Sequence, residues 1–90
     1  MAHTGHVDRK LLNRLSRIEG QVRSIRGMVE SGRDCGDVLI QVAAARAALD
    51  QAGRILLESH MEHCIVDAMK AGEGEKALDD LRTALRRFVG

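Results

Sequence analysis

The 90-residue sequence contains one aromatic residue, Phe88, and no tryptophan, tyrosine or proline. These absences leave few strong β-formers and remove the strongest helix breaker. Hydrophobic residues still make up 44% of the chain, mostly as alanine, leucine, valine and isoleucine. We therefore expect an all-α protein.

No apolar run approaches the roughly 20 residues of a membrane span, and residues 1–10 lack the apolar core of a signal peptide. We therefore expect a cytoplasmic protein with no membrane partner. The cytoplasm keeps thiols reduced, so two cysteines without a secretory signal argue against a disulfide scaffold. Residues 1–90 should form a single domain, and its monomer should be only marginally stable, because so short a chain buries only about 60% of its unfolded surface.

Charge is distributed unevenly along the chain, although the total is only +1. Residues 1–33 hold seven Lys or Arg and three Asp or Glu, a net charge of +4, whereas residues 34–90 hold seven and ten, a net charge of −3. A basic segment favours an anionic partner, and the alternative is a solvated helix rich in arginine.

Apolar residues at spacings of three and four predict a first helix at about residues 7–31. Gly32 should end this helix in the left-handed conformation, and Asp34 should cap the next one. The apolar seam of the first helix consists of Leu11, Leu15, Ile18, Val22, Ile25 and Val29.

Helical spacing continues from Cys35, and nothing punctuates the chain before residues 71–74. The sequence therefore predicts one long second helix at about residues 35–70. A third helix is expected at about residues 75–89. Its inward-facing residues should be Leu78, Leu81, Leu85 and Phe88.

His60 and Cys64 stand four residues apart, about one helical turn, so their side chains should project from the same face. Imidazole and thiolate are ligands for soft or borderline metal ions, which makes the pair a candidate metal site. The alternative is that Cys64 is a buried cysteine that acts as a small hydrophobic residue.

Cys35 falls on the same face of the predicted second helix, because the rotations to His60 and Cys64 each end about 20° from a whole number of turns. Along one helix, however, Cys35 and His60 are separated by roughly 37 Å. A second copy packed antiparallel, crossing near Ala48 among small side chains, would bring the residues together. The sequence therefore predicts a homodimer with two equal sites, each built from Cys35 of one chain and His60 and Cys64 of the other.

Two thiolates and one imidazole favour three-coordinate Cu(I), and a fourth ligand would permit Zn(II) or Ni(II). His3 and His6 are candidate extra ligands in the terminal segment, whereas His63 should be an exposed surface residue, since it is rotated about 60° from His60. Cys35 begins a predicted helix, a position typical of reactive cysteines, so redox or electrophile sensing is a second interpretation.

One flank of the first helix carries polar residues at spacings of four, three and four, with no acidic residue among them: Lys10, Arg14, Arg17 and Gln21. On the other flank, Glu19 and Arg23, and Arg26 and Glu30, stand at pairing distance. Arginine clamps phosphates, so the unpaired flank is a candidate DNA-binding surface that lacks a helix-turn-helix pattern. The alternative is a solvated helix face.

Three segments together closely resemble the copper-sensitive operon repressor family, often named CsoR/RcnR. They are residues 14–23, the pair Asp34-Cys35, and residues 59–64. The resemblance spans nearly the whole chain. Its specific features are the Arg-Ile-Glu-Gly-Gln run at residues 17–21 and the spacing of the three candidate ligands.

This resemblance implies a three-helix protomer, an antiparallel dimer, and a flat homotetramer of two dimers that binds operator DNA. It also implies that Cys35, His60 and Cys64 hold Cu(I) in trigonal geometry across the dimer interface. Metal binding would release the DNA and so derepress efflux or resistance genes. The resemblance implies neither catalysis nor a small-molecule substrate.

The family's DNA contacts correspond to Arg14, Arg17 and Gln21, to which we add Arg54 for its charge. The copper-sensing pattern often places Tyr immediately before the first Cys, in a network around the ligand His. Here Asp34 stands in its place, and Asp79 or Asp80 would supply the carboxylate of that network.

Other sensing roles remain as alternatives. His3 and His6 resemble the extra ligand of nickel- or cobalt-sensing relatives, so a Ni(II), Co(II) or Zn(II) sensor is the alternative within the family. Formaldehyde sensors of the family lack a Cys at the position of Cys64, and persulfide sensors lack the ligand His, so thiol-based sensing fits less well. A copper storage or delivery protein is the alternative class.

Overall fold

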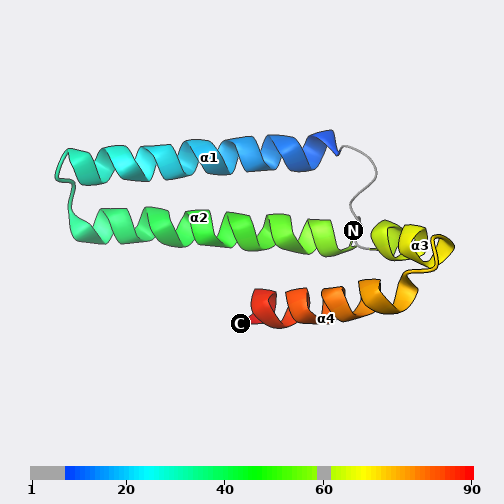
Figure 1. Cartoon of the computed structure of the whole chain (residues 1–90). Coiled ribbons are helices and arrows are strands. Elements are labelled where there is room, and N and C mark those ends of the chain that lie inside the picture. The colour runs from blue at the N-terminus through cyan, green and yellow to red at the C-terminus, as the bar shows by residue number, and fades with distance from the viewer. Residues whose placement is uncertain (1–7, 59–61) are drawn as a thin grey trace. The chain divides into compact units, whose positions relative to one another are not determined.

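The computed structural model describes residues 8–58 and 62–90, and all regular structure within these ranges is helical. This confirms the all-α prediction. None of the helices described is long and apolar enough to cross a membrane. In chain order the helices are α1 (Arg9–Glu30), α2 (Cys35–Leu56), α3 (Glu62–Lys70) and α4 (Gly74–Val89), as Figure 1 shows.

The chain divides into two compact units, and the boundary between them falls within α2. In the unit Asp8–Ala52, α1 and most of α2 form an antiparallel hairpin (Figure 1). Asp8 caps α1, because its Oδ1 accepts hydrogen bonds from the backbone N–H of Lys10 at 2.9 Å and of Leu11 at 3.2 Å. The observed helix agrees with the predicted one within two residues at each end.

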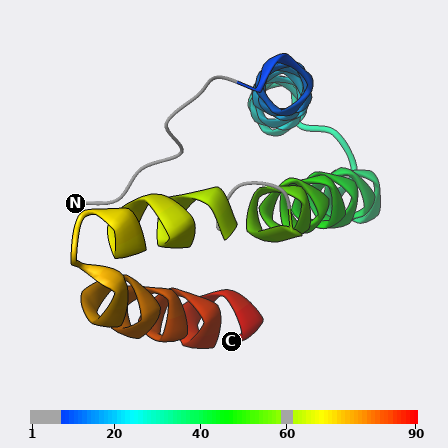
Figure 2. The ribbon, with the colours of Figure 1, turned by 90° about the vertical axis from the view of Figure 1, so that its right-hand side faces the viewer.

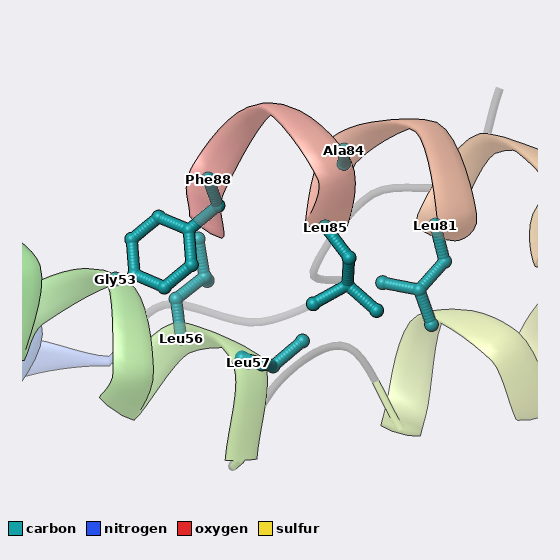
Figure 3. Close-up of a pocket in the computed structure, with 7 residues that line it drawn as sticks. All are labelled: Gly53, Leu56, Leu57, Leu81, Ala84, Leu85 and Phe88. Atoms are coloured by element: carbon teal, nitrogen blue, oxygen red, sulfur yellow. The ribbon is translucent and has the colours of Figure 1, made fainter. Parts of the chain in front are cut away.

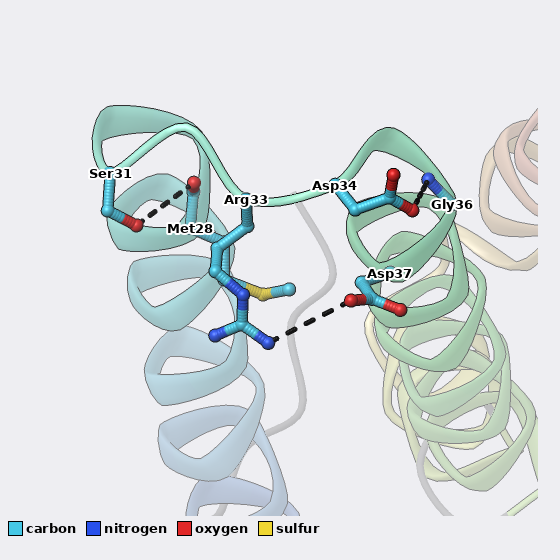
Figure 4. Close-up of polar contacts among 6 residues, drawn as sticks. All are labelled: Met28, Ser31, Arg33, Asp34, Gly36 and Asp37. Atoms are coloured by element: carbon cyan, nitrogen blue, oxygen red, sulfur yellow. Dashed lines mark hydrogen bonds and ion pairs between the residues drawn. The ribbon is translucent and has the colours of Figure 1, made fainter.

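The turn of this hairpin forms as the sequence predicts (Figure 4). Gly32 has a φ of 73°, a left-handed conformation that glycine adopts at little steric cost. Asp34 then caps α2, because its Oδ2 accepts a hydrogen bond from the backbone N–H of Gly36 at 3.1 Å. Across this turn, Arg33 Nη2 lies 4.0 Å from Asp37 Oδ2, so this exposed ion pair contributes little.

Two helices, α2 and α3, stand in the described residues where the sequence predicts one long helix over residues 35–70. Helix α2 ends at Leu56, a π-helical turn follows at Leu57 and Glu58, and α3 begins at Glu62. The described chain has four helices where three were expected.

The unit Gly53–Gly90 contains the last turn of α2 together with α3 and α4. Helices α3 and α4 pack side by side (Figure 2), joined by a turn in which Gly72 has a φ of 79°. Cys64 and Ala68, one turn apart, are the buried residues of α3. Of the four residues predicted to face inward on α4, Leu81 and Leu85 are half-buried, whereas Leu78 and Phe88 are 42% and 43% exposed. Leu81, Ala84, Leu85 and Phe88 line a small apolar pocket of about 160 Å³ against Gly53, Leu56 and Leu57 (Figure 3), and Leu78 does not.

The described chain leaves much of its apolar surface uncovered. Ile18 is the buried residue of α1, and the buried residues of α2 are the small Ala45 and Ala52. Leu39 and Ile40 on α2 are 67% and 66% exposed. Such surfaces on short chains are typical of subunits that associate.

Candidate functional site

The first candidate ligand, Cys35, is the first residue of α2. It directly follows the capping residue Asp34, and it is exposed. The cap fixes the backbone at the point where the cysteine leaves the turn. Cys35 is therefore held by a defined helix end while its side chain stays accessible to another molecule.

The second cysteine has the opposite environment. Cys64 lies on α3 and is only 6% exposed. Neither Cys64 nor Cys35 forms a disulfide within the described chain. His63 is exposed, as its rotation from His60 predicts. His60 itself, and the candidate extra ligands His3 and His6, lie outside the described residues.

Within residues 8–58 and 62–90 of one chain, no three His, Cys, Asp or Glu side chains are grouped so that they could hold a metal ion. Cys35 belongs to the unit Asp8–Ala52 and Cys64 to the unit Gly53–Gly90. The predicted site draws its ligands from two chains and includes His60, so it remains a prediction. Its donor set of two thiols and an imidazole suits a soft cation such as Cu(I).

The structure brings three of the predicted DNA-binding residues together. Arg14, Arg17 and Gln21 line one open hollow of about 460 Å³ on the α1–α2 hairpin. Ile18 and Ala48 complete the lining. Neither arginine forms an ion pair with any residue that the structure describes, as expected from the lack of acidic residues on this flank. We name this feature the arginine hollow.

Ala48 is the residue that sequence reasoning missed here, since it was considered only as a helix crossing point. The available signal was its place between Ala45 and Ala52, the two buried residues of α2, at spacings of three and four. That spacing puts Ala48 beside the face that α2 turns towards α1. Lys10, the remaining member of the predicted flank, lies exposed in the first turn of α1 and does not line the hollow.

The opposite flank of α1 is different in character. Leu15, Val22 and Leu49 form an apolar groove together with the flanking polar residues. Arg26 Nε donates to Glu30 Oε1 at 2.8 Å, which confirms one predicted pair. Glu19 and Arg23 form no such pair among the described side chains. The hairpin therefore has one basic face and one largely apolar face.

The remaining candidates lie in the unit Gly53–Gly90. Arg54 is exposed in the last turn of α2. Asp79 and Asp80 are exposed on α4, and Asp79 Oδ1 lies 3.7 Å from Arg82 Nη1. The third carboxylate candidate, Asp34, already caps α2.

Several known proteins resemble this chain in sequence and in fold. The copper-sensing transcriptional repressor CsoR of Bacillus subtilis is 47% identical over 80 residues, which cover 89% of this chain and 79% of that protein. The CsoR of Geobacillus thermodenitrificans, solved with Cu(I), superimposes with a TM-score of 0.83 at 39% identity. That match covers 99% of this chain and 96% of the other. The nickel-responsive regulator InrS matches with a TM-score of 0.68 at 48% identity, covering 98% and 99%.

These relatives regulate transcription and are not enzymes. The sequence model of the family of metal-sensitive transcriptional repressors matches residues 7–87 of this chain. These residues include both cysteines, His60 and the arginine hollow. The chain belongs to the family of metal-sensitive transcriptional repressors.

Proposed function

We propose that this protein is a Cu(I)-responsive repressor whose metal-free form binds operator DNA and releases it when the metal binds. The observation that carries this proposal is the likeness, over 99% of the chain, to the CsoR of Geobacillus thermodenitrificans solved with Cu(I). The arginine hollow supports the DNA-binding part, because it gathers two arginines and an amide on one face. Lys10 and Arg54 would extend the contact along the DNA backbone.

The proposed metal site joins two copies of the chain, with Cys35 from one and His60 and Cys64 from the other. Cu(I) is a soft cation, and it would bind the two thiolates and the imidazole together. Cys35 suits the role of a ligand offered to a second chain, because it is exposed at a capped helix end. Cys64, sheltered on α3, suits the role of the ligand that its own unit keeps from solvent.

We propose that residues 1–90 act as one domain that forms an antiparallel dimer and then a tetramer in the cytoplasm. The exposed apolar side chains support association, since Leu39 and Ile40 are about two-thirds uncovered in the single chain. The apolar groove beside Leu49 gives the hairpin a second uncovered apolar surface. A three-helix protomer would form if association joined α2 and α3 into one helix.

Metal and DNA are coupled by linkage in this proposal. If Cu(I) binds more tightly to the form that has low affinity for DNA, DNA must weaken Cu(I) binding to the same extent. The coupling free energy is typically about 1–3 kcal/mol. Asp79 or Asp80 on α4 would carry the coupling through the ligand histidine. Asp34 takes part indirectly, because its carboxylate holds the helix end that bears Cys35.

The test is a titration of the reduced protein with Cu(I), Ni(II) and Zn(II), each followed by binding to labelled DNA from upstream of its own gene. Cu(I) should weaken DNA binding most. Arg14→Gln and Arg17→Gln should each weaken the metal-free complex by about tenfold, whereas Arg26→Gln, an equal change in charge on the opposite flank, should have a small effect. If none of the three metals weakens DNA binding, the proposal fails.

The second candidate function is a Ni(II) sensor, favoured by the 48% identity with the nickel-responsive regulator InrS. His3 or His6 would then add a fourth ligand, and Ni(II) would be the metal that releases DNA. A storage or delivery protein would instead bind Cu(I) and show no affinity for DNA, and its Cu(I) binding would be indifferent to changes at Arg14 and Arg17.

A further inference from the structure

The arginine hollow has one contributor from α2, and it is a residue without any polar group. Arg14, Arg17, Ile18 and Gln21 come from two successive turns of α1, and Ala48 closes the hollow from the other helix. The hollow therefore exists because the two helices of the hairpin lie side by side. A single helix with the same basic stripe would not form it.

The lining combines uncharged and polar residues. Ile18, which is 8% exposed, and the half-buried Ala48 are uncharged. Arg14, Arg17 and Gln21 carry guanidinium and amide groups, which are hydrogen-bond donors. Because neither arginine is engaged by a carboxylate within the described chain, both can pair with an incoming anion.

We propose that the arginine hollow seats a phosphate of the DNA backbone and that Ala48 is the positioning residue that makes room for it. This inference rests on the proposed function and adds a specific contact from α2. A larger or acidic side chain at position 48 would project into the space between the two helices and hold the phosphate away from the arginines. Ala48 acts by its small size, so it contributes through the arginines rather than by a contact of its own.

The same helix provides a matched control for this proposal. Ala43 is exposed, lies five residues before Ala48, and is rotated from it by about 140° around α2. It does not line the hollow. Ala43→Glu and Ala48→Glu change the net charge equally on nearby turns, so a difference between them reports position rather than charge.

The experiment compares the intact, metal-free chain with Ala48→Glu and Ala43→Glu, each checked by analytical ultracentrifugation to keep the oligomeric state of the parent chain, because the predicted dimer crosses near Ala48. Binding is measured to a duplex from upstream of the gene and to a duplex of unrelated sequence, each at several salt concentrations. Ala48→Glu should weaken binding to both duplexes by about tenfold. It should also reduce the slope of log affinity against log salt concentration by about 0.9 for each phosphate that the protein no longer neutralises. Ala43→Glu should stay within about twofold of the parent chain.

A second measurement needs no substitution. In the unmodified protein with ¹³C-labelled alanine methyl groups, duplex DNA should shift the methyl resonance of Ala48 and leave that of Ala43 unchanged. Equal losses of affinity in Ala48→Glu and Ala43→Glu, or an unshifted Ala48 methyl in the DNA complex, would overturn the role of Ala48 and leave the proposed repressor intact. A parent chain that binds neither duplex would overturn both.

Discussion

The ring of Phe88, in the last turn of α4, lies directly over the bare α-carbon of Gly53 on α2. A Cβ added at Gly53 would stand 2.5 Å from Phe88 Cε1 and 2.8 Å from Cζ. Figure 3 shows the ring against this turn of α2, with Leu56 beside it. The absence of a side chain at residue 53 is therefore what allows the end of α4 to pack onto the end of α2.

This contact predicts that Gly53→Ala will be destabilising, although alanine normally improves a helix by about 1 kcal/mol over glycine. Displacing the ring should cost about 1–3 kcal/mol and leave a net loss of about 1 kcal/mol. In a Phe88→Ala background the same substitution should become stabilising. Urea unfolding at one fixed protein concentration measures the double-mutant cycle, and equal effects of Gly53→Ala in both backgrounds would show that the ring does not constrain residue 53.

A second prediction concerns Gly32, whose φ of 73° a side chain would strain. We expect Gly32→Ala to lower the free energy of unfolding by about 1 kcal/mol. Gly27→Ala is the control, because Gly27 lies within α1 with open space around it. This substitution should stabilise the protein by up to about 1 kcal/mol. Thermal or urea unfolding that gave the two variants the same sign would contradict the assigned turn.

A third prediction follows from the cap of α2. Asp34→Ala removes the acceptor for the Gly36 N–H and should cost about 1 kcal/mol, whereas Asp34→Asn keeps an acceptor and should cost less. Asp37→Ala, which removes only a long exposed ion pair within the same turn, should be milder still. The order of the three unfolding midpoints checks the cap, and an Asp37→Ala effect larger than that of Asp34→Ala would refute it.

A fourth prediction separates the two candidate metals. If the site binds Cu(I) with three ligands, replacing His3 and His6 together by alanine should leave both Cu(I) affinity and Cu(I)-driven DNA release within about twofold. The same double variant should lose Ni(II) binding if a terminal histidine completes a four-coordinate site. Competition titrations with a chromogenic chelator measure both affinities. A large loss of Cu(I) affinity would show that the terminal histidines belong to the copper site.

Local features of the fold followed from the sequence because each depends on neighbouring residues. The extent of α1, the glycine that ends it and the aspartate that caps α2 all depend on residues within four positions. Burial of the predicted seam does not, and in the described chain only Ile18 of that seam is buried, while Val22 and Val29 are exposed. The end of α2 at Leu56 does not follow from the sequence, because apolar residues continue at helical spacing through Leu57, Met61 and Cys64.

In the candidate site, too, the features within one helix could be predicted, and those that join two helices could not. The basic stripe with Arg14, Arg17 and Gln21 was visible from spacing alone, since all three lie on one helix. The hollow itself was not, because Ala48 is 27 positions or more away from each of them and carries no chemistry that singles it out. Contacts between separate helices depend on how the chain turns, which periodicity does not encode.

The central claim is that the metal site exists only between subunits. Cys35→Ala and Cys64→Ala should each abolish tight Cu(I) binding when prepared alone, because each removes one ligand from every site. Mixed and reassociated, the two variants form heterodimers in which one site carries both lesions and the other carries none. An intersubunit site therefore predicts that mixing restores binding.

The decisive measurement is Cu(I) stoichiometry in that mixture, with heterodimers isolated by two different affinity tags. The account predicts one tightly bound Cu(I) for each heterodimer and none for either variant alone. A heterodimer that binds no Cu(I) tightly, while the unmodified dimer binds two, would contradict the account and place all three ligands in a single chain.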